Sequence, residues 1–149
     1  MKYEKVAQYI LKQFYKENVL LAESCDKSML VCIDNYAIVR FPGKLFPFSA
    51  VCFKAAKFSR ITKAVEENNI EAHLTNRYIT VDKNKKCTEI QDEKGRLYYI
   101  DSKMLDLFKF EDPIFYVHTE KTNQPILIYD RSNAGTPYYW QAAIMPVRV

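Results

Sequence analysis

Histidine and cysteine carry much of the nucleophilic and metal chemistry of proteins, and this chain of 149 residues has few of either. His73 and His118 are the only histidines, and the cysteines stand at positions 25, 32, 52 and 87. No two cysteines have the C-x-x-C spacing, which excludes a zinc finger. We therefore expect four reduced, mostly buried thiols in a cytoplasmic protein that uses no metal and no cofactor.

Two arrangements resemble parts of hydrolytic sites. His118-Thr119-Glu120 has the H-x-E order of zinc deaminases, but the P-C-x-x-C segment that completes such a site is missing. A metal-dependent nuclease needs two carboxylates and a lysine at one point, and the best set here is Asp112, Glu120 and Lys121. Their spacing matches no nuclease signature. We expect no catalytic residues, and a nuclease is the least favoured of the alternatives.

Lysine and arginine offer another chemistry, because cations on a helix can hold DNA phosphates without reading the bases. Two sets have suitable spacing: Lys5, Lys12 and Lys16, and Lys54, Lys57, Arg60 and Lys63. The formal net charge is only +4, with 22 Lys and Arg against 18 Asp and Glu, so ordinary solvated helix faces are the alternative. We predict that both sets contact double-stranded DNA.

Hydrophobic periodicity places both basic sets on amphipathic helices. Val6 and Ile10 recur at helical spacing within residues 3–17, which predicts a first helix there. A second helix is expected over residues 49–67, beginning at Ser49.

The remaining sequence alternates β-forming residues with turn signals. Strands are expected over residues 19–22, 29–33, 36–41, 70–75, 78–82, 89–92, 96–100, 114–119, 125–129 and 140–145, with a short helix over 101–108. Hairpin turns are expected at Asp34-Asn35, Asn76-Arg77 and Lys94-Gly95. This order predicts one α+β domain over residues 1–149 with a mostly antiparallel sheet. No apolar run approaches the ~20 residues that span a bilayer, so no membrane partner is expected.

The C-terminal third has a distinctive order of segments. Tyr99–Phe108 reads as a strand leading into a short helix; two strands and a polar loop follow, and the chain closes on Ala143–Val149, with the sequence AIMPVRV. Over residues 97–149 this order resembles the final domain of bacterial DNA polymerase III β sliding clamps. Residues 1–40 are loosely similar to a clamp domain, although Ala37 replaces the usual arginine. Residues 42–90 show no such similarity.

The resemblance implies a clamp-like domain in which two main helices lie on one face of a curved sheet. Those helices would face double-stranded DNA and carry the two basic sets. The resemblance also implies a groove for short clamp-binding peptides of replication or repair proteins. Its tail residues would be Ile144, Met145, Pro146, Val147 and Arg148. Met145 suits varied apolar partners, while packing in the core of a last strand is the alternative.

The chain also departs from that family. A clamp chain holds three such domains and dimerises, so a ring of this chain would need six copies. Tyr138, Tyr139 and Trp140 add an aromatic cluster that is either buried or an interface. The favoured function is a non-enzymatic processivity factor, for example of a mobile element, that oligomerises around DNA or docks partner peptides. The alternative is a regulatory or inhibitory interaction module that uses the fold without encircling DNA.

Overall fold

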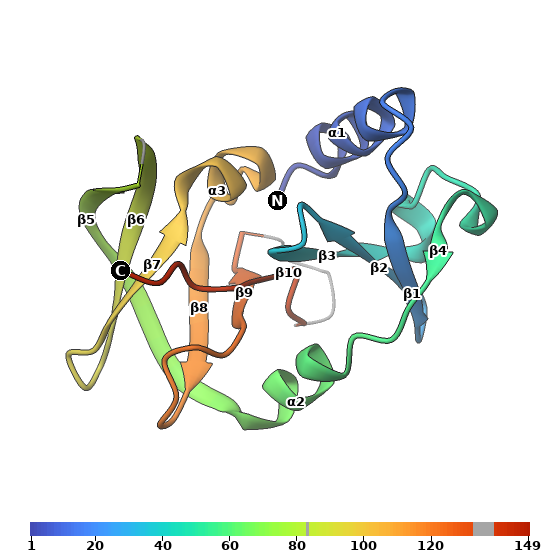
Figure 1. Cartoon of the computed structure of the whole chain (residues 1–149). Helices are drawn as coiled ribbons and strands as arrows, with labels where there is room; N and C mark the ends of the chain where they lie inside the picture. The colour runs from blue at the N-terminus through green and yellow to red at the C-terminus, as the bar shows by residue number, and fades with distance from the viewer. Residues whose placement is uncertain (83, 133–138) are drawn as a thin grey trace.

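The computed structural model describes residues 1–82, 84–132 and 139–149 (Figure 1). Within these residues the α-helices are α1 (Tyr3–Tyr15), α2 (Ser59–Glu67) and α3 (Ser102–Phe108). The strands are β1 (Leu21–Cys25), β2 (Ser28–Ile33), β3 (Ala37–Pro42), β4 (Lys54–Ala55), β5 (Asn68–Val81), β6 (Lys85–Asp92), β7 (Leu97–Asp101), β8 (Pro113–His118), β9 (Ile126–Asp130) and β10 (Ala142–Ile144). Single 3₁₀ turns lie at Gly43–Leu45 and Ala50–Cys52. None of the described helices is long and apolar enough to cross a membrane.

All ten strands belong to one open sheet in the order β4-β1-β2-β3-β10-β9-β8-β5-β6-β7. Every neighbouring pair is antiparallel except the short β1–β4 pair. The predicted α+β class and the mostly antiparallel sheet are therefore confirmed. Figure 1 shows the direction of the strands changing from β2 and β3 to β5 and β6, so the sheet turns between its two ends.

Two similar units supply the six central and neighbouring strands from β1 to β8 in the sheet order. In each unit a helix precedes three consecutive antiparallel strands: α1 leads into β1-β2-β3, and α3 leads into β8-β9-β10. The units join where β3 pairs with β10, in a register that sets Val39 opposite Ala142. Outside them, β4 extends the sheet beyond β1, and β5, β6 and β7 extend it beyond β8. The start of α1 meets the end of α3, because the Lys2 N–H donates to the Phe108 carbonyl at 2.9 Å. Figure 1 shows both helices above the sheet.

Each face of the sheet has its own hydrophobic core. Val6 and Ile10 of α1 and Phe108 of α3 pack on one face, whereas Ile61 and Ala64 of α2 pack on the other. Side chains of successive strand residues point to opposite faces, and β9 follows this rule. Its Ile126 and Ile128 join the first core and Leu127 joins the second. The helix pair on one face is therefore α1 with α3, and α2 lies opposite.

The helix expected over residues 49–67 is wrong in its first half, because α2 begins only at Ser59. The preceding segment forms an aromatic cluster instead. The rings of Phe46, Phe48 and Phe53 pack on one another, and Phe53 also contacts Phe14 of α1 at a centroid distance of 5.2 Å. Burying these rings favours an irregular path over a helical one.

The hairpin expected at Asn76-Arg77 is also wrong. Residues 68–81 form the single strand β5, whose pairing with β6 is irregular between Leu74 and Tyr78. Asn76 has a φ of 62° there, which suits a bulge as well as a turn. The hairpin turns at Asp34-Asn35 and Lys94-Gly95 are confirmed.

The four cysteines are free thiols, as expected. Only Cys87 is fully buried, while Cys25 and Cys32 are half-buried and Cys52 is exposed. The expectation that most of them are buried is therefore wrong.

Candidate nucleic-acid and partner surfaces

The lysines of α1 lie on its solvent side. Val6 and Ile10 face the core, whereas Lys5, Lys12 and Lys16 are exposed. Steps of seven and four residues keep these three lysines on one flank of the helix. Carboxylates border that flank, including Asp34 at the β2–β3 turn, whose oxygens accept a hydrogen bond from the hydroxyl of Tyr9 at 2.6 Å. We call Lys5, Lys12 and Lys16 the α1 lysines.

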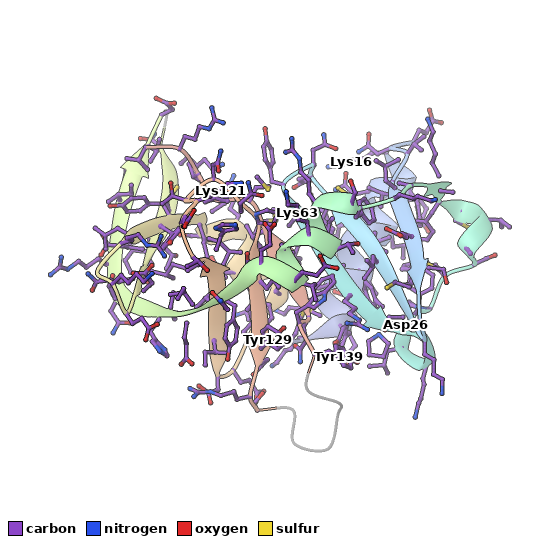
Figure 2. The ribbon with its side chains drawn as sticks, turned by 90° about the horizontal axis from the view of Figure 1, so that it is seen from below. Lys16, Asp26, Lys63, Lys121, Tyr129 and Tyr139 are labelled. Atoms are coloured by element: carbon purple, nitrogen blue, oxygen red, sulfur yellow. The ribbon has the colours of Figure 1, made fainter. Side chains whose placement is uncertain are left out.

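The second basic set lies elsewhere. Lys54 belongs to β4, Lys57 precedes α2, and Arg60 and Lys63 are on α2 itself. All four side chains are exposed. Figure 2, seen from below, has α2 and Lys63 in front, on the side of the sheet opposite to α1. The expected joint surface of both sets is therefore wrong, because Ile61 and Ala64 anchor α2 to the other face.

The C-terminal tail leaves β10 and runs along neighbouring strands. The Met145 N–H donates to the Tyr36 carbonyl and the Val147 N–H donates to the Tyr99 carbonyl, both at 2.8 Å. The second bond ties the tail to the outer edge of β7. Ile144 belongs to the core, Met145, Pro146 and Val147 are half-buried, and Arg148 is exposed.

Two hollows border the tail, and together we call them the tail groove. A cavity of about 690 Å³ lies between residues 145–149, Leu97–Tyr99 of β7 and the loop 120–123. A second hollow of about 340 Å³ lies between β3, α2 and Met145. Met145 lines both hollows, and its flexible side chain can adapt to different apolar partners. Apolar side chains and cations, including Arg60 and Arg148, line its walls.

His118 fixes the loop that forms one wall of the groove. Its Nδ1 accepts hydrogen bonds from the N–H groups of Glu120 and Lys121, each at 3.0 Å. The proton of the ring must then be on Nε2, which donates to Glu67 Oε2 at 3.1 Å. The loop is thereby joined to the end of α2.

Arg96 holds the same loop from the other side. It donates to the carbonyls of Thr119 at 2.7 Å and His118 at 3.2 Å, and its Nε pairs with Asp92 at 2.7 Å. Burial opposes the charge of Asp92. The backbone and side chain of Arg96 and the hydroxyl of Tyr98 outweigh burial and hold the Asp92 pKa below its usual range. The groove wall is therefore preformed.

The aromatic segment before β10 lies partly outside the described residues, since Tyr138 is among those not described. Trp140 is buried in the core beside α2, and Tyr139 is half-buried. The guanidinium of Arg40 lies over both rings, 4.3 Å from the centroid of Tyr139 and 5.5 Å from that of Trp140. In the described part this cluster is mainly a packing feature.

The residues considered for a nuclease are not brought together. Asp112 precedes β8 and pairs with Arg131 at 2.9 Å, whereas Glu120 and Lys121 follow that strand. A strand of this length separates its ends by about 20 Å. Among the described residues, no group of three or more His, Cys, Asp or Glu side chains is placed to hold a metal ion.

Two surfaces thus stand out: the α1 lysines on the face that α1 and α3 share, and the tail groove between β7 and α2. They lie on different elements, so two ligands can bind at the same time, one on each surface. Comparison of the chain with models of protein families, with curated proteins and with solved structures finds no match.

Proposed function

We propose that this chain is a non-enzymatic, sliding-clamp-like accessory protein of DNA replication. It oligomerises around duplex DNA and docks short peptides of replication or repair proteins. One observation carries the proposal: α1 and α3, each leading into three antiparallel strands, lie together on one face of a single sheet. In the sliding-clamp family that the sequence resembles, two helices face DNA and the sheet lies outside. Here α3, rather than the expected α2, lies beside α1 on one face. The α1 lysines then supply contacts to phosphates.

The two ends of the sheet supply the means of assembly. β4 pairs with β1 only at Leu21 and Ala22, so the outer edge of β1 is covered for part of its length. β7 ends the sheet on the other side, where the tail covers part of its outer edge through the bond from the Val147 N–H to the Tyr99 carbonyl. Backbone groups that such edges leave uncovered can bind strands of another chain. Different edges joining head to tail build rings when the rotation closes.

The direct test combines the mass in solution with retention on DNA. We expect a closed oligomer of six copies by native mass spectrometry when closed circular duplex DNA is present. We expect the protein to stay on circular DNA and to be lost when a restriction enzyme linearises it. A monomer that shows no salt-dependent duplex binding would contradict the proposal and favour the regulatory module.

The tail groove is tested with peptides copied from clamp-binding segments of bacterial replication and repair proteins. We expect Met145→Asp to weaken peptide binding by about tenfold or more, since burying a methionine side chain contributes roughly 1.5–3 kcal/mol. Fluorescence anisotropy with labelled peptides measures this change. Val51→Asp is the matched control, because Val51 is 89% exposed and lies outside the groove. Equal peptide binding by both variants would show that Met145 does not contact the peptide.

A further inference from the structure

We propose that the DNA path on the helix face continues beyond α3 onto the β5–β6 hairpin. There Lys86, held by the ring of Tyr78, makes a further contact to the phosphate backbone of duplex DNA. This inference rests on the proposed function, because it requires that DNA lies along α1 and α3. Neither residue belongs to the basic sets that the sequence indicates.

The register of the strands places both side chains on the helix face of the sheet. Thr88 of β6 points to α3, because its hydroxyl lies 2.8 Å from that of Ser102, the first residue of α3. Side chains two residues apart on a strand share a face, so Lys86 points the same way. Tyr78 of β5 is directly opposite Thr88, and cross-strand partners also share a face.

Lys86 and Tyr78 form a preorganised pair. The Lys86 ammonium lies 3.9 Å from the centroid of the Tyr78 ring, and Tyr78 is 56% exposed. The ring attracts the cation without neutralising it. It also restricts a flexible side chain, so less conformational entropy is lost when a phosphate binds. The neighbouring Lys85 differs, because it pairs with Asp101 at 3.2 Å.

The pair continues a line of lysines that begins on α1. The line passes from the α1 lysines to α3 where Lys2 meets Phe108, and α3 carries exposed lysines near both ends. Lys86 lies about 7 Å further along β6 than Thr88. Figure 1 shows the upper ends of β5 and β6, then α3 and α1, following one another along the top of the sheet. The lysines of the line are Lys16, Lys12, Lys5, Lys2, Lys109, Lys103 and Lys86.

Carboxylates also occur along this line. Asp101, the N-cap of α3, is paired with Lys85, which lies outside the line. The other carboxylates are Glu4, Glu17 and Asp34 on or beside α1, Asp106 on α3 and Asp82 just after β5. The seven lysines of the line outnumber these five, so the surface carries a small net positive charge that attracts a polyanion. The line crosses two helices and one hairpin, so it suits an extended phosphate backbone better than a small anion.

The test measures affinity for a labelled duplex of arbitrary sequence over a series of salt concentrations. Lys86→Ala is expected to weaken binding several-fold. It is also expected to reduce the magnitude of the negative slope of log K against log salt by about 0.9, the value for one phosphate contact. The matched control is Lys94→Ala, which removes an exposed lysine at the β6–β7 turn, the other end of the same strand. It is expected to leave affinity and slope unchanged.

The role of Tyr78 is separated from that of Lys86 by a double-mutant cycle. Tyr78→Phe keeps the ring and is expected to bind like the parent protein. Tyr78→Ser is expected to lose part of the Lys86 contribution, and to cost nothing further when Lys86 is already alanine. If Tyr78→Ser weakens single-stranded DNA binding more than duplex binding, Tyr78 is a stacking platform for bases and the phosphate contact is overturned.

The outcomes distinguish this inference from the proposed function. If charge reversal of the α1 lysines abolishes duplex binding while Lys86→Ala keeps the parent slope, only the hairpin contact is overturned. If the parent protein shows no salt-dependent duplex binding, both fail. Thermal melts check that the variants fold, and their midpoints are expected to match the parent because both side chains are exposed.

Discussion

Reversing the charge of the α1 lysines, with Lys5→Glu, Lys12→Glu and Lys16→Glu together, is expected to weaken duplex DNA binding by about a hundredfold or more. The three side chains are exposed on one flank of α1, so the change removes three cations and adds three anions at the proposed contact surface. Glutamate and lysine have similar helix propensities, and the core residues of α1 are untouched. The helix is therefore expected to stay folded.

The salt dependence provides the more specific measurement. The slope of log K against log salt is negative, and each lost phosphate contact reduces its magnitude by about 0.9. Losing three contacts therefore makes the slope less steep by about 2.7. Fluorescence anisotropy over a salt series, with two unrelated duplex sequences, is expected to give this change for both. A variant that keeps the parent slope would show that these lysines are an ordinary solvated face.

The matched control lies on the opposite face. Lys57→Glu, Arg60→Glu and Lys63→Glu change the net charge by the same amount but act at α2, on the other side of the sheet. Long-range electrostatic effects are therefore similar in the two triple variants, and a difference between them reports local contact. We expect the α2 variant to bind duplex DNA with nearly the parent slope. The reverse result would place DNA on the α2 face and contradict the proposed orientation.

Local signals in the sequence were sufficient for several elements of the fold. Val6 and Ile10 at helical spacing predicted α1, and Asp34-Asn35 predicted the β2–β3 turn, where both residues have positive φ angles of 50° and 60°. The helix at residues 101–108 was confirmed as α3, and the Asp101 side chain caps it by accepting a hydrogen bond from the Lys103 N–H. Each of these features depends on residues close in sequence.

The errors arose where distant contacts decide the structure. Residues 49–58 have helical periodicity, but Phe53 packs against Phe14 and two other phenylalanines that are distant or irregularly spaced in the sequence. Asn76 favours a left-handed conformation, and the sequence does not reveal whether that conformation makes a turn or a bulge. In the structure it makes a bulge, because β6 pairs with β5 on both sides of Asn76, at residues 72–74 and 78–81.

The surfaces were predicted less completely than the fold. Spacing along α1 placed its lysines on one flank, which depends only on helix geometry. The prediction that the basic residues near α2 share a surface with the α1 lysines failed because α2 packs on the opposite face of the sheet. Local sequence patterns do not determine which face a helix covers. Lys86 and Tyr78 lacked any signal, because their juxtaposition depends on the β5–β6 register across the irregularity at Leu74.

Replacing Asp130 with asparagine is expected to lower the free energy of unfolding by about 3–5 kcal/mol, the cost of breaking a buried ion pair. One carboxylate oxygen of Asp130 lies 2.6 Å from the amino group of Met1, and both groups are fully buried. The carboxylate also accepts N–H groups of Glu111, Asp112 and Ser132, each at 3.1 Å. Asparagine has one acceptor oxygen and no charge, so several of these donors would lose their partner.

The same carboxylate makes stability depend on pH. Burial opposes its charge, but the Met1 amino group, Ser132 and the backbone N–H groups outweigh burial and hold the Asp130 pKa well below its usual range. Its pKa is therefore lower in the folded than in the unfolded chain, where it is about 3.9. The stabilisation is complete above that value and is lost as the pH falls below it. Asp130→Asn is expected to remove this part of the acid sensitivity.

Thermal melts between neutral and acidic pH measure both effects, and Asp112→Asn is the matched control. Asp112 pairs with Arg131 on the surface, where the two side chains are 54% and 48% exposed. Exposed pairs contribute at most about 1 kcal/mol, so this variant is expected to melt close to the parent at every pH. Asp130→Asn is expected to melt roughly 10 °C lower at neutral pH, with the gap narrowing in acid as the parent carboxylate becomes protonated. A constant gap at all pH values would show that Asp130 acts through hydrogen bonds alone, without its charge.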